Sequence, residues 1–294
     1  MAYLRHFIAI TALTLLLLQG GALKSPTLAP QTSLRQTTEG DLMSKNVAPE
    51  SEIIESINAA KLTTLALNLH PGSEHREDST PTPQTSRHCR ALAYQALLNL
   101  PAEHRQELQD LTLFYTEDGR RGLGGNGSII LRCLNVTDSE FIGVMTHEMG
   151  HIVDSNYLKG TDENAESSFK DFDIPVLADD ASATFYAISW NDETTKKSDS
   201  NSLDFVSIYA TTDPFEDFAE TYAYYRLHGA EFRQLKNSSA MLREKYEFMK
   251  LEVFGGSEFG FEESDEDATQ NFNIWLRNYD VTVLPFSLQS FMSS

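Results

Sequence analysis

The sequence predicts an α+β fold with a small sheet and a mostly helical remainder. Three observations lead to this prediction. Two short apolar segments flank a glycine-rich turn, which is typical of paired strands. A helix with a well-marked start follows them directly, and a second well-marked helix begins near residue 213.

The composition is that of a globular protein with a substantial core. The chain has 294 residues, and its 43 acidic side chains outnumber the 23 basic ones, so the formal net charge is −20. A surface of this sign repels the phosphate backbone, and nucleic acid is therefore not an expected partner. We expect a monomer whose partners are peptides or proteins.

Residues 1–22 have the pattern of a secretory signal peptide. A short segment with one arginine precedes an apolar run at 7–18, and small residues follow at Gly20 and Ala22. About 12 apolar residues are too few to span a bilayer comfortably. We expect a secreted protein, extracellular or periplasmic, without stable membrane insertion after signal cleavage. An uncleaved N-terminal anchor is the alternative.

Residues 23–87 are predicted to form a low-complexity linker or pro-segment. They are rich in Ser, Thr, Pro, Gln and Glu, and only 49–68 shows a weak helical period. From Cys89 onward apolar positions recur regularly. The folded domain is therefore expected to cover 88–294.

Cys89 and Cys133 are the only cysteines, and in an exported chain they would most simply form a disulfide. Two buried free thiols are the alternative. The chain has no Cys-x-x-Cys spacing, which excludes a zinc site built from cysteines.

The first elements of the domain are two helices and two strands. Helices are predicted at 91–98 and 101–108, and strands at 111–115 and 128–134. The stretch 118–127 between the strands contains five glycines. It lacks the Gly-Lys-Ser/Thr ending of a phosphate-binding loop and has no helix after it, so it is predicted to be a hairpin loop.

The central helix begins at Thr137 and carries the sequence motif that indicates a catalytic site. Thr137 and Glu140 have the spacing of a capping box. The helix contains His147-Glu148-Met149-Gly150-His151, an HExxH motif. The two histidines lie one turn apart on one face, so both imidazoles can bind one ion. We expect one Zn²⁺ per chain, with Glu148 as the base that takes a proton from water. The alternative is that the two histidines are solvated or lie in the core and bind no metal.

A catalytic zinc needs a third protein ligand. The extended motif with Gly at 154 and His or Asp at 157 is excluded, because Asp154 and Tyr157 occupy these positions. The better source is the second helix, which Asp213 and Pro214 begin and Gly229 ends.

Glu216 on this helix is the preferred third ligand. It could instead only cap its own helix, Glu220 could be the ligand, and His228 is a weaker rival. Gly150 costs helix stability, which suggests that another element packs closely there, and Ala219 is suited to that contact.

The motif His147-Glu-Met-Gly-His151, followed by Tyr209 and by Glu216-Asp-Phe-Ala-Glu220, resembles the gluzincin metallopeptidases related to the catalytic domain of anthrax lethal factor. The resemblance covers roughly 111–229 and implies a zincin-like fold, in which a small upper sheet lies over the HExxH helix and a mostly helical part lies below it. It implies that Glu148 is the base and that His147, His151 and Glu216 hold zinc.

The same resemblance implies that Tyr209 stabilises the tetrahedral intermediate and that Glu220 lies in the second shell of the metal. From the residues alone, Tyr209 could also be one more core aromatic. Residues 156–204 should hold an insertion or an altered substrate cleft.

The sequence thus predicts a secreted zinc endopeptidase. The alternative is a non-proteolytic binding module or toxin component that keeps its zinc on the same fold. The acidic residues at 171, 173, 179, 180 and 258–266 match no calcium loop and are expected to be solvated. Trp190, Trp275 and 271–291 are expected in the core, with a strand at 281–284.

Overall fold

The computed structural model describes residues 68–71, 82–260 and 278–293. The chain divides into two units, Met1–Ser56 and Ile57–Ser294, and all described residues belong to the second. The predicted signal peptide, most of the predicted linker and Trp275 lie outside the described residues. Within the described ranges, no helix has both the length and the apolar character needed to cross a membrane.

The upper part contains a four-stranded sheet in the order β1-β2-β4-β3. Its strands are β1 (Asn68–Pro71), β2 (Asp110–Phe114), β3 (Gly122–Gly125) and β4 (Ser128–Arg132). The neighbours β1, β2 and β4 run parallel, whereas β3 runs antiparallel to β4. Strands β2 and β4 confirm the two predicted strands, and small sheets with many helices confirm the mixed α and β class. Strand β1 lies in the range assigned to the linker.

The glycine-rich stretch is more ordered than predicted. A hairpin is present, but it joins β3 to β4 and not the two predicted strands, which run parallel. Strand β3 takes up 122–125 of the expected loop, and the turn is only Asn126 and Gly127. Both turn residues have positive φ, 49° and 77°. An Asn-Gly pair in this conformation matches the right-handed twist of the flanking strands, which explains why the loop is so short.

Helix α3 (Pro83–Leu98) begins before the predicted helix and before the expected domain start at 88. Thr82 is its N-cap and accepts a hydrogen bond from the Thr85 amide, with Pro83 in the first turn. Proline here starts a helix because its missing N–H would have no helical partner at that position. Helix α4 (Ala102–Gln106) follows Pro101 and is shorter than predicted.

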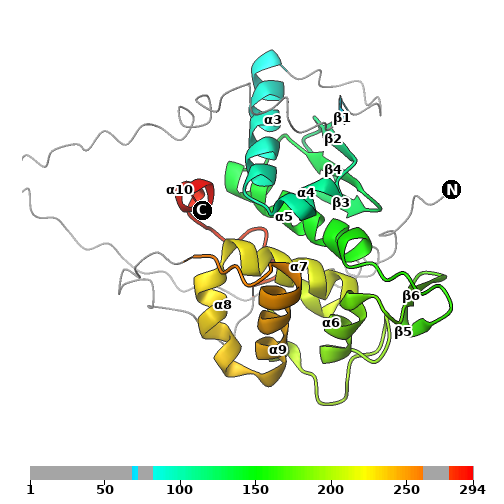
Figure 1. Cartoon of the computed structure of the whole chain (residues 1–294). Coiled ribbons are helices and arrows are strands. Elements are labelled where there is room, and N and C mark those ends of the chain that lie inside the picture. Colours follow the sequence, from blue (N-terminus) through cyan, green and yellow to red (C-terminus); the bar gives the residue numbers. More distant parts are fainter. Residues whose placement is uncertain (1–67, 72–81, 261–277, 294) are drawn as a thin grey trace, which may run out of the picture. The chain divides into compact units, whose positions relative to one another are not determined.

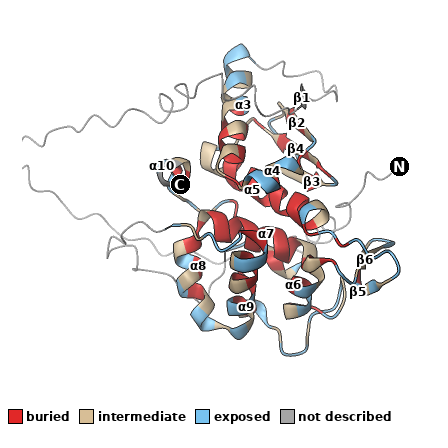
Figure 2. Ribbon diagram, viewed as in Figure 1, coloured by how far each residue is buried: buried red, intermediate tan, exposed pale blue. Residues whose placement is uncertain are grey.

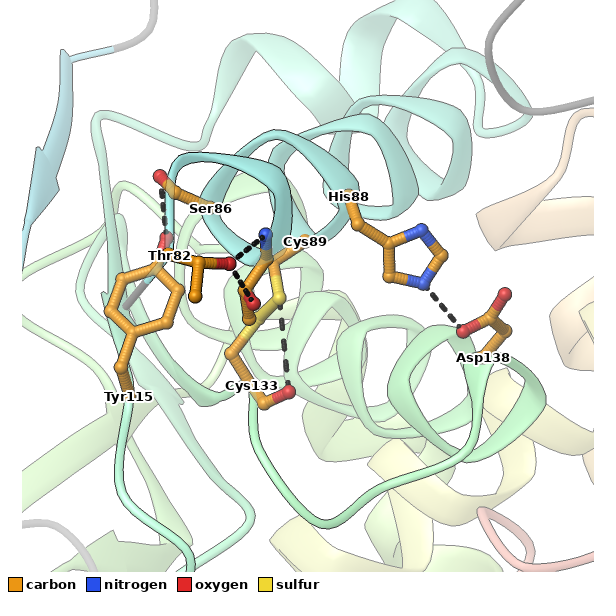
Figure 3. The surroundings of a disulfide bond; sticks show 8 residues. Thr82, Ser86, His88, Cys89, Tyr115, Cys133 and Asp138 are labelled. Carbon is orange, nitrogen blue, oxygen red and sulfur yellow. Dashed lines mark hydrogen bonds and ion pairs between the residues drawn. A yellow bond between two sulfur atoms is a disulfide. The ribbon is translucent and has the colours of Figure 1, made fainter. Parts of the chain in front are cut away.

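A disulfide joins α3 to the chain just after β4 (Figure 3). The Cα atoms of Cys89 and Cys133 are 6.1 Å apart, within the usual range for a disulfide. Directly before Cys89 in the chain, His88 has its Nε2 2.8 Å from Asp138 Oδ1 at the start of the next helix. These two links attach α3 to the beginning of the HExxH helix.

The HExxH helix is α5 (Asp138–Ile152), and it continues into the π-helix η1 (Val153–Tyr157). The predicted start is confirmed, since Thr137 Oγ1 accepts a hydrogen bond from the Glu140 amide at 3.1 Å. All residues from Phe141 to Ile152 are buried. Helix α5 contacts β3, β4 and α3 on one side and helix α7 on the other, and Figures 1 and 2 show this central, buried position.

The lower part is mostly helical, as predicted. Its main helices are α6 (Ala181–Ser189), α7 (Pro214–Leu227), α8 (Gly229–Leu235) and α9 (Ala240–Phe248). Short helical turns are η2 (Ser202–Asp204), η3 (Tyr209–Thr211), η4 (Lys236–Ser238) and η5 (Met249–Val253), and α10 (Leu288–Ser293) ends the described chain. The expected insertion at 156–204 contains α6 and a two-stranded sheet of β5 (Glu166–Asp171) and β6 (Ile174–Leu177).

Helix α7 is held in the lower part by a buried ion pair. The Asp217 carboxylate accepts hydrogen bonds from Lys245 Nζ at 2.7 and 2.8 Å and from Trp190 Nε1 at 3.0 Å. Both charges are fully buried, and a buried charge is tolerated only when it is paired and hydrogen-bonded. The expected core position of Trp190 is confirmed.

The predicted strand at 281–284 is wrong. The segment forms a turn in which the Leu284 amide donates to the Val281 carbonyl at 3.1 Å. The Asp280 carboxylate accepts a hydrogen bond from the Thr282 amide at 2.7 Å, and such a local side-chain bond competes with strand pairing.

Two of the acidic residues considered for calcium binding have local structural roles. Asp179 accepts hydrogen bonds from the amides of Thr161 and Asp162, and Asp180 caps α6.

Helices α5 and α7 meet at Gly150. A Cβ added there would lie 2.8 Å from the Cα of Ala219, closer than real Cβ atoms come to backbone. The expected close approach of another element at Gly150 is therefore confirmed. Because the partner atoms belong to the α7 backbone, a side chain at 150 would have to separate the two helices.

We predict that Gly150→Ala lowers stability, although alanine normally favours a helix interior by about 1 kcal/mol over glycine. Overpacking against backbone costs about 1–3 kcal/mol, and the net loss should lower the Tm by a few degrees. Thermal unfolding checks this, with Glu244→Ala on the exposed side of α9 as control. A higher Tm for Gly150→Ala would contradict the tight contact.

Candidate metal centre

Two histidines of α5 and one glutamate of α7 converge in the buried space between these helices. Glu216 Oε2 lies 3.2 Å from His147 Nε2 and 3.5 Å from His151 Nε2. One ligand atom from each of the three side chains lies within 4.8 Å of the other two. In the part of the chain that the structure describes, this is the one group of histidine, cysteine or carboxylate side chains that could hold a metal.

The spacing of these atoms fits a zinc ion. Zinc binds histidine nitrogen and carboxylate oxygen at about 2.0–2.2 Å, and in a tetrahedral site such ligands lie roughly 3.3–3.6 Å from one another. The two distances to Glu216 Oε2, 3.2 and 3.5 Å, are close to that range. Two nitrogens and one oxygen also leave a fourth position for water or substrate, which is the donor set of catalytic zinc sites.

Glu216 reaches the histidines because another residue caps its helix. Asp213 Oδ1 accepts the amides of Phe215 at 3.0 Å and of Glu216 at 2.8 Å. The N-terminus of α7 is thereby satisfied, as predicted for Asp213. The Glu216 carboxylate is directed to the imidazoles, so the capping alternative does not describe where this side chain lies.

Glu220 lies one turn farther along α7 and contacts the other nitrogen of His147. Its Oε1 is 2.8 Å from His147 Nδ1. Its Oε2 accepts hydrogen bonds from Ser207 Oγ at 2.6 Å and from the Val281 amide at 2.8 Å. A carboxylate on Nδ1 orients the ring and directs Nε2 to a metal. Glu220 is thus placed behind His147 and is not among the grouped ligand atoms.

The charge balance of the group raises the pKa of His147. Burial by itself lowers this pKa, but the hydrogen bonds with Glu216 and Glu220 outweigh it and hold the pKa well above its ordinary value. In the metal-free chain the raised pKa favours a second proton on the His147 ring. A cation that enters must displace this proton, so metal binding should weaken as the pH falls.

Glu148 is enclosed by the glycines of β3. A Cβ added at Gly122 would lie 2.3 Å from Glu148 Oε1, and one added at Gly124 would lie 2.6 Å from the Glu148 carbonyl oxygen. The edge strand can approach α5 this closely only because these positions lack side chains. Sequence reasoning missed this role; the signal was the alternation of glycine at 122 and 124 within one strand.

Tyr209 is half-buried on η3, and its hydroxyl is directed into the site. Its OH donates to Glu216 Oε1 at 3.1 Å, and its ring centroid lies 6.1 Å from that of His147. Burial and the nearby Glu216 charge raise its pKa, so the phenol stays protonated and can donate a hydrogen bond. This position differs from that of a purely core aromatic.

His228, the weaker rival, is not part of the group. It forms the C-cap of α7 and stacks on Tyr224 with ring centroids 5.3 Å apart. Burial lowers its pKa to about 4. Sequence reasoning also missed Ser207 and Val281, which lie 13 and 61 residues from Glu220, donate to its carboxylate and belong to no motif.

We predict that Glu216→Gln and Glu220→Gln differ in zinc binding. Glu216→Gln should leave the purified protein without stoichiometric zinc, because a neutral amide is a poor zinc ligand. Glu220→Gln should bind zinc about 10- to 100-fold more weakly, the usual effect of changing a partner of a ligand histidine. Chelator competition measures both, with the exposed Glu231→Gln as control. The reverse order would make Glu220 the ligand.

Comparison with known proteins gives one match. A family described as "Putative zinc-binding metallo-peptidase" matches residues 134–277, just under half of the chain. The matched range includes α5 and α7 and thus His147, His151 and Glu216. No curated protein and no solved structure matches the chain significantly. The family match and the grouped ligands together support a zinc metallopeptidase.

Proposed function

We propose that this protein is an exported, zinc-dependent endopeptidase of the gluzincin type. The observation that carries the proposal is the convergence of His147, His151 and Glu216 on one point, with Glu148 on the same helix. Export rests on the signal-like pattern of 1–22, and the Cys89–Cys133 pair is in keeping with an oxidising compartment.

In this proposal His147, His151 and Glu216 hold zinc, which when bound lowers the pKa of water and polarises the substrate carbonyl. Glu148 accepts a proton from the attacking water and returns it to the leaving nitrogen. The peptide C–N bond then breaks with a neutral amine, and not an amide anion, as the leaving group. Tyr209 then changes its acceptor from Glu216 Oε1 to the substrate oxygen on which negative charge develops, and donates its hydrogen bond there. Glu220 keeps His147 in the orientation that directs Nε2 to zinc.

The substrate in this proposal is an extended peptide. Strand β3 stands at the end of the sheet order and lies directly against Glu148. An edge strand can accept a further strand through main-chain hydrogen bonds, which bind peptides largely irrespective of their side chains. A peptide added along β3 would therefore run past the base.

We predict that Glu148→Gln cleaves an unfolded protein substrate about 100- to 10,000-fold more slowly than the wild type, because general base catalysis contributes about that much. The variant should keep its zinc, since Glu148 is not among the grouped ligands. Product formation by mass spectrometry and zinc content check both statements. Glu231→Gln is again the control.

Equal cleavage by wild type and Glu148→Gln would contradict the role of the base. Zinc in both proteins with cleavage by neither would favour the non-proteolytic binding module. A chelator should remove the wild-type activity and added zinc should restore it, which separates metal-dependent cleavage from a contaminating protease.

A further inference from the structure

We propose that residues 278–282, here named the C-terminal strap, complete the metal centre, and that Arg121 is a positioning residue that clamps this strap. The inference rests on the proposed function in that zinc is taken as the metal. The strap and Arg121 both lie outside the range 134–277 that the family match covers.

The strap first fixes the segment that carries Tyr209. The Ile208 amide donates to the Asn278 carbonyl at 2.9 Å, and the Tyr209 amide donates to the Tyr279 carbonyl at 2.7 Å. These two backbone hydrogen bonds fix the position of the Tyr209 backbone, from which its hydroxyl reaches Glu216. Because they involve only main-chain atoms, they depend on where the strap lies and not on its side chains.

The strap next holds Glu220. The Val281 amide, which is fully buried, donates to Glu220 Oε2 at 2.8 Å. Ser207 donates to the same oxygen, so the carboxylate is fixed from two sides while Oε1 faces His147. The strap thus acts on a ligand histidine through Glu220, at one remove from the metal position.

Arg121 connects the strap to the other side of the site. Its guanidinium pairs with the buried Asp280 carboxylate through Nη2 and donates to Thr282 Oγ1 at 2.7 Å through Nη1. Glu140 on α5 lies 3.4 Å from the same Nη1. The planar guanidinium can serve all three partners at once, which a lysine ammonium matches poorly.

The position of Arg121 in the chain gives the clamp its meaning. Arg121 immediately precedes β3, whose glycines enclose Glu148. At Gly143 of α5, an added Cβ would lie 2.6 Å from the Thr282 carbonyl oxygen, so the strap also packs tightly on the HExxH helix. The Arg121 side chain therefore fixes the position of the strap relative to β3, the strand beside Glu148. Through Glu220, the strap in turn fixes the orientation of His147.

The test measures zinc in the full chain and does not depend on cleavage. Arg121→Met should weaken zinc binding about tenfold, the lower end of the effect seen for partners of metal ligands. It should also change the visible absorption bands of the Co²⁺-substituted protein, which report ligand geometry. Asp280→Asn should act in the same direction, and Arg121→Lys should fall between wild type and Arg121→Met. Arg120→Met, at the exposed neighbouring position, is the matched control and should match the wild type.

The inference is overturned if Arg121→Met binds zinc like the wild type with unchanged Co²⁺ bands, or if Arg120→Met has an equal effect. Thermal unfolding of the metal-free variants excludes a general loss of fold, and a loss of zinc that only follows unfolding would also overturn it. Unchanged zinc binding in Arg121→Met with cleavage lost in Glu148→Gln would leave the proposed function intact. Absence of zinc binding in the wild type would remove the proposed function first.

Discussion

The close contact of α5 with α7 at Gly150 and Ala219 is the constraint on which the site depends. The two histidines come from one helix and the glutamate from the other, so the distance between the helix axes decides whether the three side chains can share an ion. A glycine facing an alanine brings the backbones together at that point. The buried Asp217–Lys245 pair then fixes α7 from below, and the disulfide with the His88–Asp138 contact fixes the start of α5 from above.

Much of the fold follows from local signals in the sequence. Thr137 and Asp213 each cap a helix as their spacing predicts, and the strands at β2 and β4 appear where apolar segments flank the glycines. The two histidines share one face because a motif placed on a capped helix leaves little freedom in how its side chains point, whereas Glu216 joins them through the contact of α7 with α5. These signals act over one or two helical turns, which is why they can be read without a structure.

Most of the features that the sequence does not predict depend on contacts that are distant in the sequence. The glycines of β3 predict a loop because glycine disfavours strands in general, whereas α5 lies so close to Gly122 and Gly124 that only glycine fits there. The apolar residues after position 280 predict a strand, but the local hydrogen bond from the Thr282 amide to Asp280 favours a turn. Arg121 and Val281 reach the site from far along the chain, and neither belongs to a recognisable motif. The residues that could bind the metal are therefore easier to predict from the sequence than the residues that hold them in position.

The disulfide divides the molecule's cross-links between two sides of one helix. Cys89 and Cys133 attach α3 to the chain that enters α5, on the side away from α7. The metal position lies between α5 and α7. A thiol reductant and a metal chelator would therefore act at different places on the same scaffold. Loss of the disulfide would leave the link between α5 and α7 in place, and loss of the metal would leave the link between α3 and α5 in place.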